Sequence, residues 1–409
     1  MTGGRVTRTV LGVALVGGWI AAAVLLWQSS VVPGGIHLGG LDEHRYFSSH
    51  LLARTASFTH VSTLLAVLGL LATLAAAAAY ARWGELWAGG SLAGPVGTGT
   101  LLGMAGLAVL WLAQLPFQVL GVWWERRHGL VRTGYLGVIF QNWAALAGEF
   151  VFASAALLVV MTLARRLGER WWIVGAPVFT AVTLLFVWVQ PWLLQTHRLH
   201  DARIAAAAAQ LERRERVGHV RVVVEDVDAQ TSAPNAEAVG VGSSRRVVLW
   251  STLLDGRFSQ REIRVVLAHE LGHIKHDHLW KGIAWTGLLA IPLAFLLARG
   301  TRRRGGMGNP EAVPLGLLIL VVVELATLPV QTLVTRHMEE EADWSALVAA
   351  RDPAAQISLF RRFGPTTLSQ PDPGLFRYVL FEDHPTLMQR IALVRAWQRA
   401  QAASAAQSP

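Results

Sequence analysis

The sequence contains no cysteine, which excludes disulfide bonds and cysteine-ligated metal sites. Any zinc ion would have to be held by histidine and carboxylate side chains. Lysine occurs only at Lys275 and Lys281, and charged residues make up just 15% of the 409 residues. With 53% hydrophobic residues and a mean hydropathy of +0.41, the chain is too apolar for an ordinary soluble enzyme. The composition predicts an integral membrane protein that crosses the bilayer several times.

The net charge of +9 comes almost entirely from arginine. The arginines lie beside apolar runs, which indicates membrane lipids with anionic head groups as partners and not nucleic acid. Tryptophans such as Trp27, Trp83 and Trp171 lie at or near the ends of these runs, as is typical of a membrane interface. Seven runs predict membrane-spanning helices: residues 10–27, 58–80, 100–120, 141–163, 171–194, 282–298 and 313–334.

Two of the seven runs contain a carboxylate, Glu149 in the fourth and Glu324 in the seventh. A carboxylate inside a membrane span is costly and is therefore a candidate for a functional role. The alternative is that each faces a water-filled cavity or pairs with an arginine near the surface.

The motif His-Glu-x-x-His occurs once, at residues 269–273. On a helix, residues four apart share a face, so His269 and His273 are spaced to bind one zinc ion. Glu270 leaves the helix about 100° further round, near the metal but not on the ligand face. This arrangement is typical of zinc metalloproteases, in which the glutamate takes a proton from the attacking water.

The residues around the motif also favour a helix. Ser259 and Glu262 match a capping box, with Ser259 as the N-cap residue. If this helix continues unbroken into the sixth apolar run at Gly282, the nine residues after His273 place the zinc site about 13 Å from the start of that span.

A third protein ligand is needed to complete such a site. A metzincin would carry glycine and histidine where this chain has His276 and Leu279, so that class is excluded. We interpret His276 and His278 either as extra ligands or as polar residues at the membrane edge. The better candidate is Glu339, four residues before Asp343 on one helix face, with Asp343 placed to orient a ligand histidine. The alternatives are that Glu340 is the ligand or that the three consecutive glutamates only face solvent.

Several motifs, taken in order, make the chain resemble the type I CAAX prenyl protease family of integral-membrane zinc endopeptidases, which is related to the HtpX heat-shock proteases. The similar segments run from about residue 45 to 395 and are residues 115–117 with 125–129, 235–236 with 239–240, 246–249 with 252–254, 269–273, 339–343, and His384-Pro385 with Arg390. The resemblance implies a peptidase with a catalytic face in the cytoplasm. It makes His384 a candidate oxyanion donor or substrate contact, with capping of a helix beside Pro385 as the alternative, and Arg390 a candidate partner of Asp343.

The chain departs from the family pattern in three places. Glu237 stands where an aromatic residue is common, the hairpin loop reads Ser-Ser-Arg-Arg, and the C-terminal motif has a single proline, Pro385. These departures concern the substrate and not the chemistry. Arginine counting also gives a different orientation, because the short loops opposite the catalytic segment are richer in arginine and would be cytoplasmic by the positive-inside rule. We keep the cytoplasmic catalytic face that the resemblance implies.

Residues 237–242 and 246–250 predict two strands of a hairpin just before the zinc helix. A zinc peptidase needs an extended substrate, and an exposed sheet edge can hold one as an added strand. Asn235, which offers both a donor and an acceptor, is our candidate for substrate binding, with shaping of the turn after Pro234 as the alternative.

The sequence thus predicts a mainly α, seven-span helical membrane protein with a gluzincin-type zinc peptidase domain containing a small β-hairpin or sheet, one zinc ion per chain, and a peptide or protein substrate near the bilayer. We divide the chain into residues 1–195 with five spans, 196–281 with the zinc helix, 282–334 with two spans, and 335–409 with the third ligand and a disordered tail. The competing interpretations are a zinc-containing membrane sensor and, with Glu149 and Glu324 as a polar pathway, a transporter.

Overall fold

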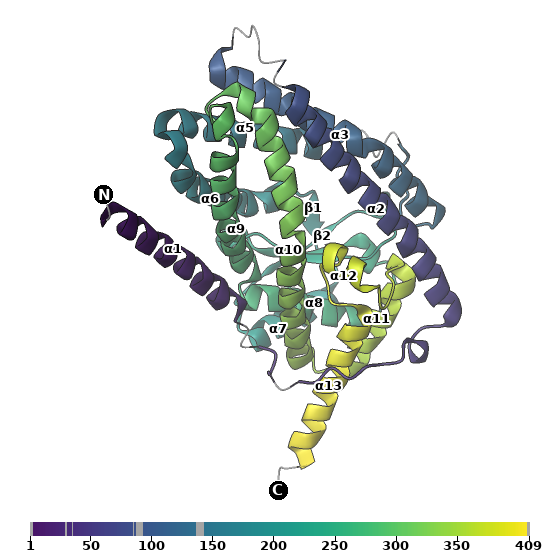
Figure 1. Ribbon diagram of the computed structural model, residues 1–409. Helices are drawn as coiled ribbons and strands as arrows, with labels where there is room; N and C mark the ends of the chain where they lie inside the picture. Colours follow the sequence, from purple (N-terminus) through teal and green to yellow (C-terminus); the bar gives the residue numbers. More distant parts are fainter. Residues whose placement is uncertain are drawn as a thin grey trace.

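The computed structural model describes residues 3–28, 31–34, 36–84, 86, 93–135 and 143–406, with side chains omitted for residues 3–11 and 143–149. The side chain of Glu149 therefore lies outside the described residues. The fold is mainly helical with one small sheet, as the sequence predicts (Figure 1). Its long helices are α1 (Gly3–Trp27), α2 (Ser49–Trp83), α3 (Gly94–Arg127), α5 (Trp143–Leu167), α6 (Trp171–Leu193), α9 (His278–Gly300) and α10 (Val313–Ala350).

Five stretches of the described residues are long and apolar enough to cross a membrane: Ser49–Trp83, Gly94–Arg127, Phe150–Leu193, His278–Gly300 and Pro310–Ala350. One of them, Phe150–Leu193, contains two helices, α5 and α6, separated by the short 3-10 turn Gly168–Arg170. A shorter apolar segment, Gly12–Trp27, belongs to α1. The protein is therefore built as an integral membrane protein.

Several helix connections meet at one end of this bundle. In the turn after α9, Arg302 forms an ion pair with Glu169, which lies in the turn between α5 and α6, with 2.6 Å between Nε and Oε1. Arg304 donates to the carbonyl oxygen of Ala81, near the end of α2.

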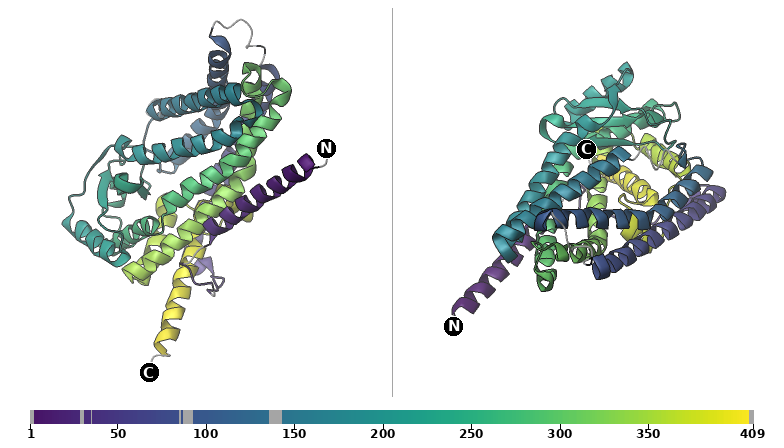
Figure 2. Two further views of the ribbon diagram at one scale, coloured as in Figure 1. Left: turned by 90° about the vertical axis from the view of Figure 1, so that its left-hand side faces the viewer. Right: turned by 90° about the horizontal axis from the view of Figure 1, so that it is seen from above.

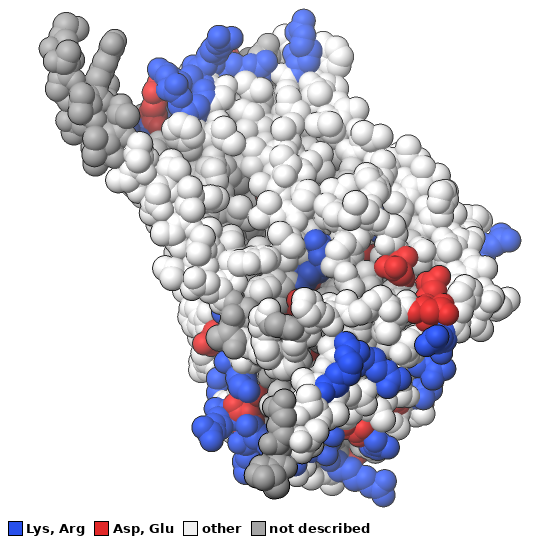
Figure 3. Space-filling model, turned by 60° about the horizontal axis from the view of Figure 1, so that its bottom comes forward, with Lys and Arg blue, Asp and Glu red and all other residues white. Residues whose placement is uncertain are grey.

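On the face drawn in Figure 3, charged side chains gather toward two ends and leave a broad uncharged band between them. A band of this kind is what a bilayer core requires of the surface that it covers.

Helix α1 stands apart from most of the bundle and contacts α9 (Figure 1). The indole N–H of Trp19 donates to the carbonyl oxygen of Leu288 at 2.8 Å. Pro292, four residues after Leu288, has no N–H to offer that carbonyl. The proline thus frees an acceptor in the apolar part of α9, and Trp19 satisfies it.

The sheet has the strand order β1-β2-β4-β3, in which β2 and β4 are parallel and the outer pairings are antiparallel. The strands are β1 (Thr196–Arg198), β2 (Arg221–Glu225), β3 (Ala236–Val239) and β4 (Arg246–Trp250). The expected hairpin is present as β3 and β4. One sheet face buries Val247 and Leu249 against Leu211 of α7 (Ala202–Glu215) and Leu267 of α8 (Gln260–Lys275). The zinc-motif helix is therefore fixed on a rigid sheet.

Helix α8 begins as the sequence predicts, because Ser259 and Glu262 form both bonds of the capping box. It does not continue into the sixth span. The helix ends at Lys275, and Asp277 adopts the left-handed conformation with φ 54° before α9 starts at His278. A left-handed residue breaks the helical path, so the condition on which the spacing of about 13 Å depended is not met.

Helix α10, by contrast, is unbroken from Val313 to Ala350 and contains both the seventh apolar run and Glu339. The expected boundary at residue 334 coincides with no break in this helix. Three more helices follow, α11 (Pro353–Thr367), α12 (Leu375–Phe381) and α13 (Leu387–Ala406), and α13 projects beyond the body of the molecule (Figures 1 and 2).

Among the spans lies a largely apolar cavity of about 440 Å³. Glu324 of α10 lines it together with Thr327 and Gln331, and the Gln331 amide lies 3.3 Å from the Glu324 carboxylate. Glu324 thus lies at the wall of a cavity, and among the described residues it contacts a glutamine and not an arginine.

Candidate metal centre

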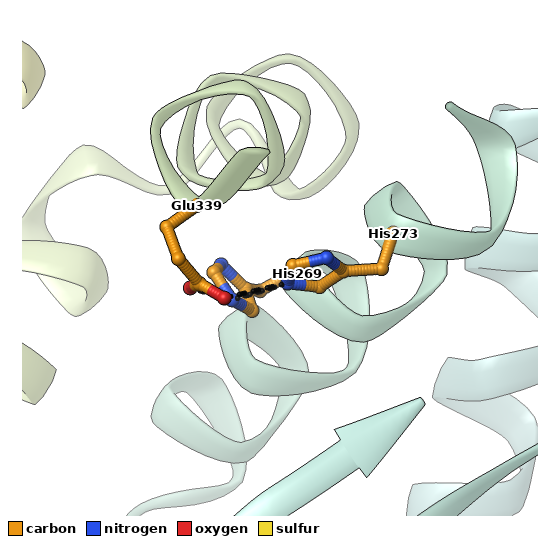
Figure 4. A group of neighbouring side chains, drawn as sticks. All are labelled: His269, His273 and Glu339. Carbon is orange, nitrogen blue, oxygen red and sulfur yellow. Dashed lines mark hydrogen bonds and ion pairs between the residues drawn. The ribbon is translucent and has the colours of Figure 1, made fainter. Parts of the chain in front are cut away.

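Helices α8 and α10 bring His269, His273 and Glu339 together (Figure 4). The Nε2 atoms of the two imidazoles are 3.1 Å apart, and the Glu339 carboxylate lies 3.1 Å from the first and 3.4 Å from the second. All three side chains are largely buried. Among the described residues, this is the one group of histidines and carboxylates spaced to hold a metal ion.

The spacing of these atoms fits zinc. Zinc bonds of about 2.0–2.1 Å at tetrahedral angles place neighbouring ligand atoms roughly 3.3 Å apart. The two Nε2 atoms are 3.1 Å apart, and the two imidazoles lie 3.1 Å and 3.4 Å from the two different oxygens of Glu339, so the separations are close to that value. Two imidazoles and one carboxylate are also the donor set of a catalytic zinc site, in which a fourth position stays open.

Gly272 explains how α8 and α10 come close enough for Glu339 to reach the histidines. A Cβ atom at position 272 would lie 3.0 Å from the Cβ of Ser345 and 3.4 Å from the backbone of Ala342. Both neighbours belong to α10 and are small. Gly272, the residue just before the second histidine of the His-Glu-x-x-His motif, is therefore a helix-packing residue.

The far side of His269 is held by a buried charge network. Its Nδ1 lies 3.0 Å from Oδ1 of Asp343, as expected from the spacing of Asp343 and Glu339 on α10. Arg390 of α13 donates to both Asp343 oxygens, at 2.6 and 2.7 Å. A carboxylate that is bound in this way fixes the ring orientation and leaves Nε2 of His269 facing the centre.

His278 contacts the other histidine, although sequence reasoning did not give it this place. It is 4% exposed, and its Nδ1 lies 2.8 Å from Nδ1 of His273. His278 is not among the described residues that are spaced to hold a metal ion, and it is the first residue of α9, where the apolar stretch His278–Gly300 begins. The interpretation as a polar residue at the membrane edge therefore stays a prediction for its position, but the sequence did not show its contact with His273. His276 instead contacts Ser345, at 3.3 Å.

Glu270 lies beside the cluster on α8 and is 6% exposed. Burial raises the pKa of its carboxyl group to about 7, against the opposing effect of His269. The backbone N–H of Ala238 in β3 donates to this carboxylate. A carboxylate with a pKa near neutrality is suited to accept a proton and then to release it.

The two histidines differ in their electrostatics. Burial lowers the pKa of His269, but Asp343 and Glu339 outweigh it and raise that pKa to about 10. Burial lowers the pKa of His273 to about 3. The carboxylates thus favour one positive charge at the centre, which a bound metal ion would supply in place of a proton on His269.

His384 approaches from the loop between α12 and α13. Its Nε2 lies 3.1 Å from Oε2 of Glu339, and its Nδ1 lies 2.8 Å from Asp383. Burial lowers the pKa of His384, but these two carboxylates raise it to about 9. The side chain is 46% exposed, so one side of the ring faces open space beside the cluster. The start of α13 is capped by Thr386, whose hydroxyl accepts from the N–H of Gln389.

A residue that the sequence did not single out holds the loop of His384. Arg336 is buried in α10 and donates to the carbonyl oxygens of Tyr378 and Glu382 at 2.6 Å. An arginine after an apolar run gives no signal of this contact, because its acceptors are backbone atoms 42 and 46 residues away.

Strand β3 is an outer strand of the sheet, and its free side faces α8. The N–H of Trp250 donates to the carbonyl oxygen of Asn235. In an antiparallel pair this turns the backbone groups of Ala236 and Ala238 away from β4. The contact between Ala238 and Glu270 shows that this edge lies next to the cluster. The side chain of Asn235 is exposed at the start of the edge.

Comparison with known proteins adds three findings. The model of peptidase family M48 matches residues 194–398. The chain is 26% identical over 260 residues to the uncharacterized metalloprotease YhfN of Bacillus subtilis (strain 168), covering 59% of this chain and 60% of the relative. It is 30% identical over 183 residues to a protease HtpX homolog of Methylibium petroleiphilum, covering 40% of this chain and 65% of the relative. The matches thus span less than two thirds of these relatives.

The crystal structure of S. mikatae Ste24p has a similar fold, with a TM-score of 0.71. The similarity covers 93% of this chain and 96% of that one at 16% sequence identity. At so low an identity the likeness is one of fold. It extends beyond the peptidase match to the helices on both sides of residues 194–398.

Proposed function

Because the chain belongs to peptidase family M48, a family of metalloproteases, we propose that it is a membrane-embedded endopeptidase that binds one zinc ion through His269, His273 and Glu339. We further propose that α1 and the α5–α6 pair bring the number of membrane spans to seven. The observation that carries the proposal is the convergence of these three side chains, at zinc-ligand spacing, beside the buried carboxylate of Glu270. The fold and the metalloprotease family favour this function over a sensor or a transporter.

In the proposed mechanism, His269, His273 and Glu339 would hold a zinc ion, which when bound would act as a Lewis acid on the attacking water and the scissile carbonyl. Glu270 accepts the proton of the attacking water and then delivers it to the leaving amine. Asp343, held by Arg390, keeps His269 oriented. His384, on the open side of the cluster, donates a hydrogen bond to the oxyanion that forms.

The free edge of β3 is the proposed substrate site. An extended peptide can pair with the outward backbone groups of Ala236 and with the outward carbonyl oxygen of Ala238, whose N–H donates to Glu270, so the peptide would lie alongside Glu270. Asn235 stands at the start of this edge and offers its amide to the same peptide. The substrates are membrane-associated, and CAAX-like tails fit the resemblance that the motifs carry. The catalytic face is proposed to be cytoplasmic.

The test is zinc content together with hydrolysis of a membrane-tethered peptide by the purified protein in detergent. Glu270→Gln keeps the metal cluster intact, so it should retain zinc and lose hydrolysis by several orders of magnitude, beyond the 10²–10⁴ typical of acid–base help alone. Glu339→Ala should lose zinc, whereas Glu340→Ala, one residue away on another face of α10, should keep it.

Near-normal turnover by Glu270→Gln would contradict the mechanism. Loss of zinc from Glu340→Ala but not from Glu339→Ala would contradict the ligand assignment.

A further inference from the structure

Each ligand histidine faces the cluster with its Nε2 atom. To leave a lone pair on Nε2, the neutral ring must carry its hydrogen on Nδ1, where it needs an acceptor. Asp343 is this acceptor for His269. Among the described residues, the partner of Nδ1 of His273 is not a carboxylate but His278, with 2.8 Å between the two Nδ1 atoms. Two neutral imidazoles can share such a contact only if one nitrogen donates and the other accepts.

Glu341 decides which nitrogen donates. The carboxylate of Glu341 lies 2.7 Å from Nε2 of His278, and Lys281 lies 3.3 Å from the same oxygen. An ionised carboxylate only accepts, so Nε2 of His278 carries a hydrogen. In the neutral ring, Nδ1 of His278 is then an acceptor, and Nδ1 of His273 is the donor. This leaves Nε2 of His273 with a lone pair directed at the metal position.

The break between α8 and α9 makes this contact possible. In a continuous helix, positions 273 and 278 would be five residues apart and about 140° away from each other around the axis. Asp277 in the left-handed conformation ends α8 and turns the first residue of α9 back toward His273. The side chains of His278 and Glu341 are 3% and 2% exposed, so water cannot compete for the hydrogen bond between them.

We propose that His278 and Glu341 are positioning residues of the metal centre, which hold His273 in the tautomer that can bind zinc. The inference rests on the proposed function. A Glu341–His278–His273 series then does for the second ligand what Asp343 does for the first, with one additional ring between the carboxylate and the ligand.

The experiment measures zinc affinity of the full chain in detergent by competition with a chelator. His278→Leu and Glu341→Met remove the acceptor for His273 and the acceptor for His278, respectively, from two different helices. Each should weaken zinc binding roughly 10- to 100-fold, as loss of the outer partner of a metal ligand does. His278→Gln should stay within a few fold of the wild type, because its amide oxygen can accept from His273 while its amide N–H donates to Glu341.

His276→Leu is the matched control, since it also deletes an imidazole at the α8–α9 junction, but this imidazole is only partly buried and contacts Ser345 and not a ligand. It should leave zinc affinity unchanged. Thermal unfolding of each protein after zinc removal shows whether the variant is folded. If His278→Leu does not fold, the zinc affinities of His278→Gln and Glu341→Met still test the positioning role.

Wild-type zinc affinity in His278→Leu or Glu341→Met overturns the inference while leaving the proposed function intact. Equal losses in His278→Gln and His278→Leu also overturn it, because the role would then be one of ring packing. A wild-type protein that binds no zinc overturns both proposals.

Discussion

In the proposed function, single side chains at the edge of the metal cluster determine how a substrate peptide binds beside it. Asn235 illustrates this, because its backbone carbonyl is used by β4 while its side chain is exposed beside the free edge of β3. A substrate strand added at that edge would pass this amide. This position agrees with the proposed role of Asn235 in substrate binding.

Asn235→Ala should keep fold and zinc content but lower kcat/KM on a membrane-tethered peptide. One or two lost hydrogen bonds correspond to roughly 1–3 kcal/mol, or about 5- to 150-fold. Ser243→Ala, at an exposed position in the connection between β3 and β4, is the control and should not change kcat/KM. Unchanged kcat/KM in Asn235→Ala would assign the residue to the turn after Pro234.

Residue-scale prediction from the sequence worked where helical spacing alone sets the geometry. His269 and His273 share a face, and Asp343 contacts His269 one turn after Glu339. It did not give the contact of His278 with His273, because that contact depends on the left-handed backbone of Asp277, which the sequence does not show. The pairing of Arg390 with Asp343 was indicated only by the resemblance to a family, since 47 residues separate them.

At the scale of elements, the cluster depends on the close packing of two helices. Gly272 is the contact point, with Ser345 and Ala342 of α10 opposite it. Gly272→Ala should raise the helix propensity of α8 by about 1 kcal/mol and yet weaken zinc binding roughly tenfold, because Glu339 would be pushed away from the histidines.

The control for this change is Gly282→Ala in α9, where an added Cβ would meet nothing within 4 Å. It gains the same helix propensity without altering the contact between α8 and α10. Chelator competition on both variants checks the prediction, and equal zinc affinity in the two would show that the spacing of α8 and α10 does not control the site.

The existence of the helices followed from hydropathy, but their lengths did not. The second expected span covered residues 58–80, whereas α2 runs from Ser49 to Trp83. His50 and Arg54 lower the hydropathy of its first turns although the backbone is helical, and the Ser48 cap marks the true start. The same limitation hid the continuity of α10, because Arg336 and the glutamates after it read as the end of a span.

At the scale of the whole molecule, the metal cluster is tied to the bilayer. Glu339 follows Val313 by 26 residues on one unbroken helix, or about 39 Å along its axis. A hydrocarbon core is about 30 Å thick, so an upright α10 that starts at the far boundary would hold Glu339 roughly 10 Å beyond the near boundary. The α10 backbone thus fixes the height of the cluster.

A series of membrane-anchored peptides tests this geometry. Each carries the same cleavable sequence at a different number of residues from the anchor. We expect kcat/KM in vesicles to pass through a maximum at one spacer length, because only that length brings the bond to the cluster. The same peptides without the anchor should show no such maximum, and equal cleavage at every spacer length would contradict the prediction.

We therefore expect the unbroken α10 to act as a molecular ruler. A protease usually selects its bond by pockets that recognise neighbouring side chains, but on the proposed function the number of helical residues between the membrane and Glu339 would select it as well. Inserting a single residue in that interval would rotate Glu339 by about 100° and take it out of the cluster. Inserting about one full turn would restore its direction and raise it by roughly 5 Å. The length of α10 would thus set the distance between the membrane and the peptide bond that is cleaved.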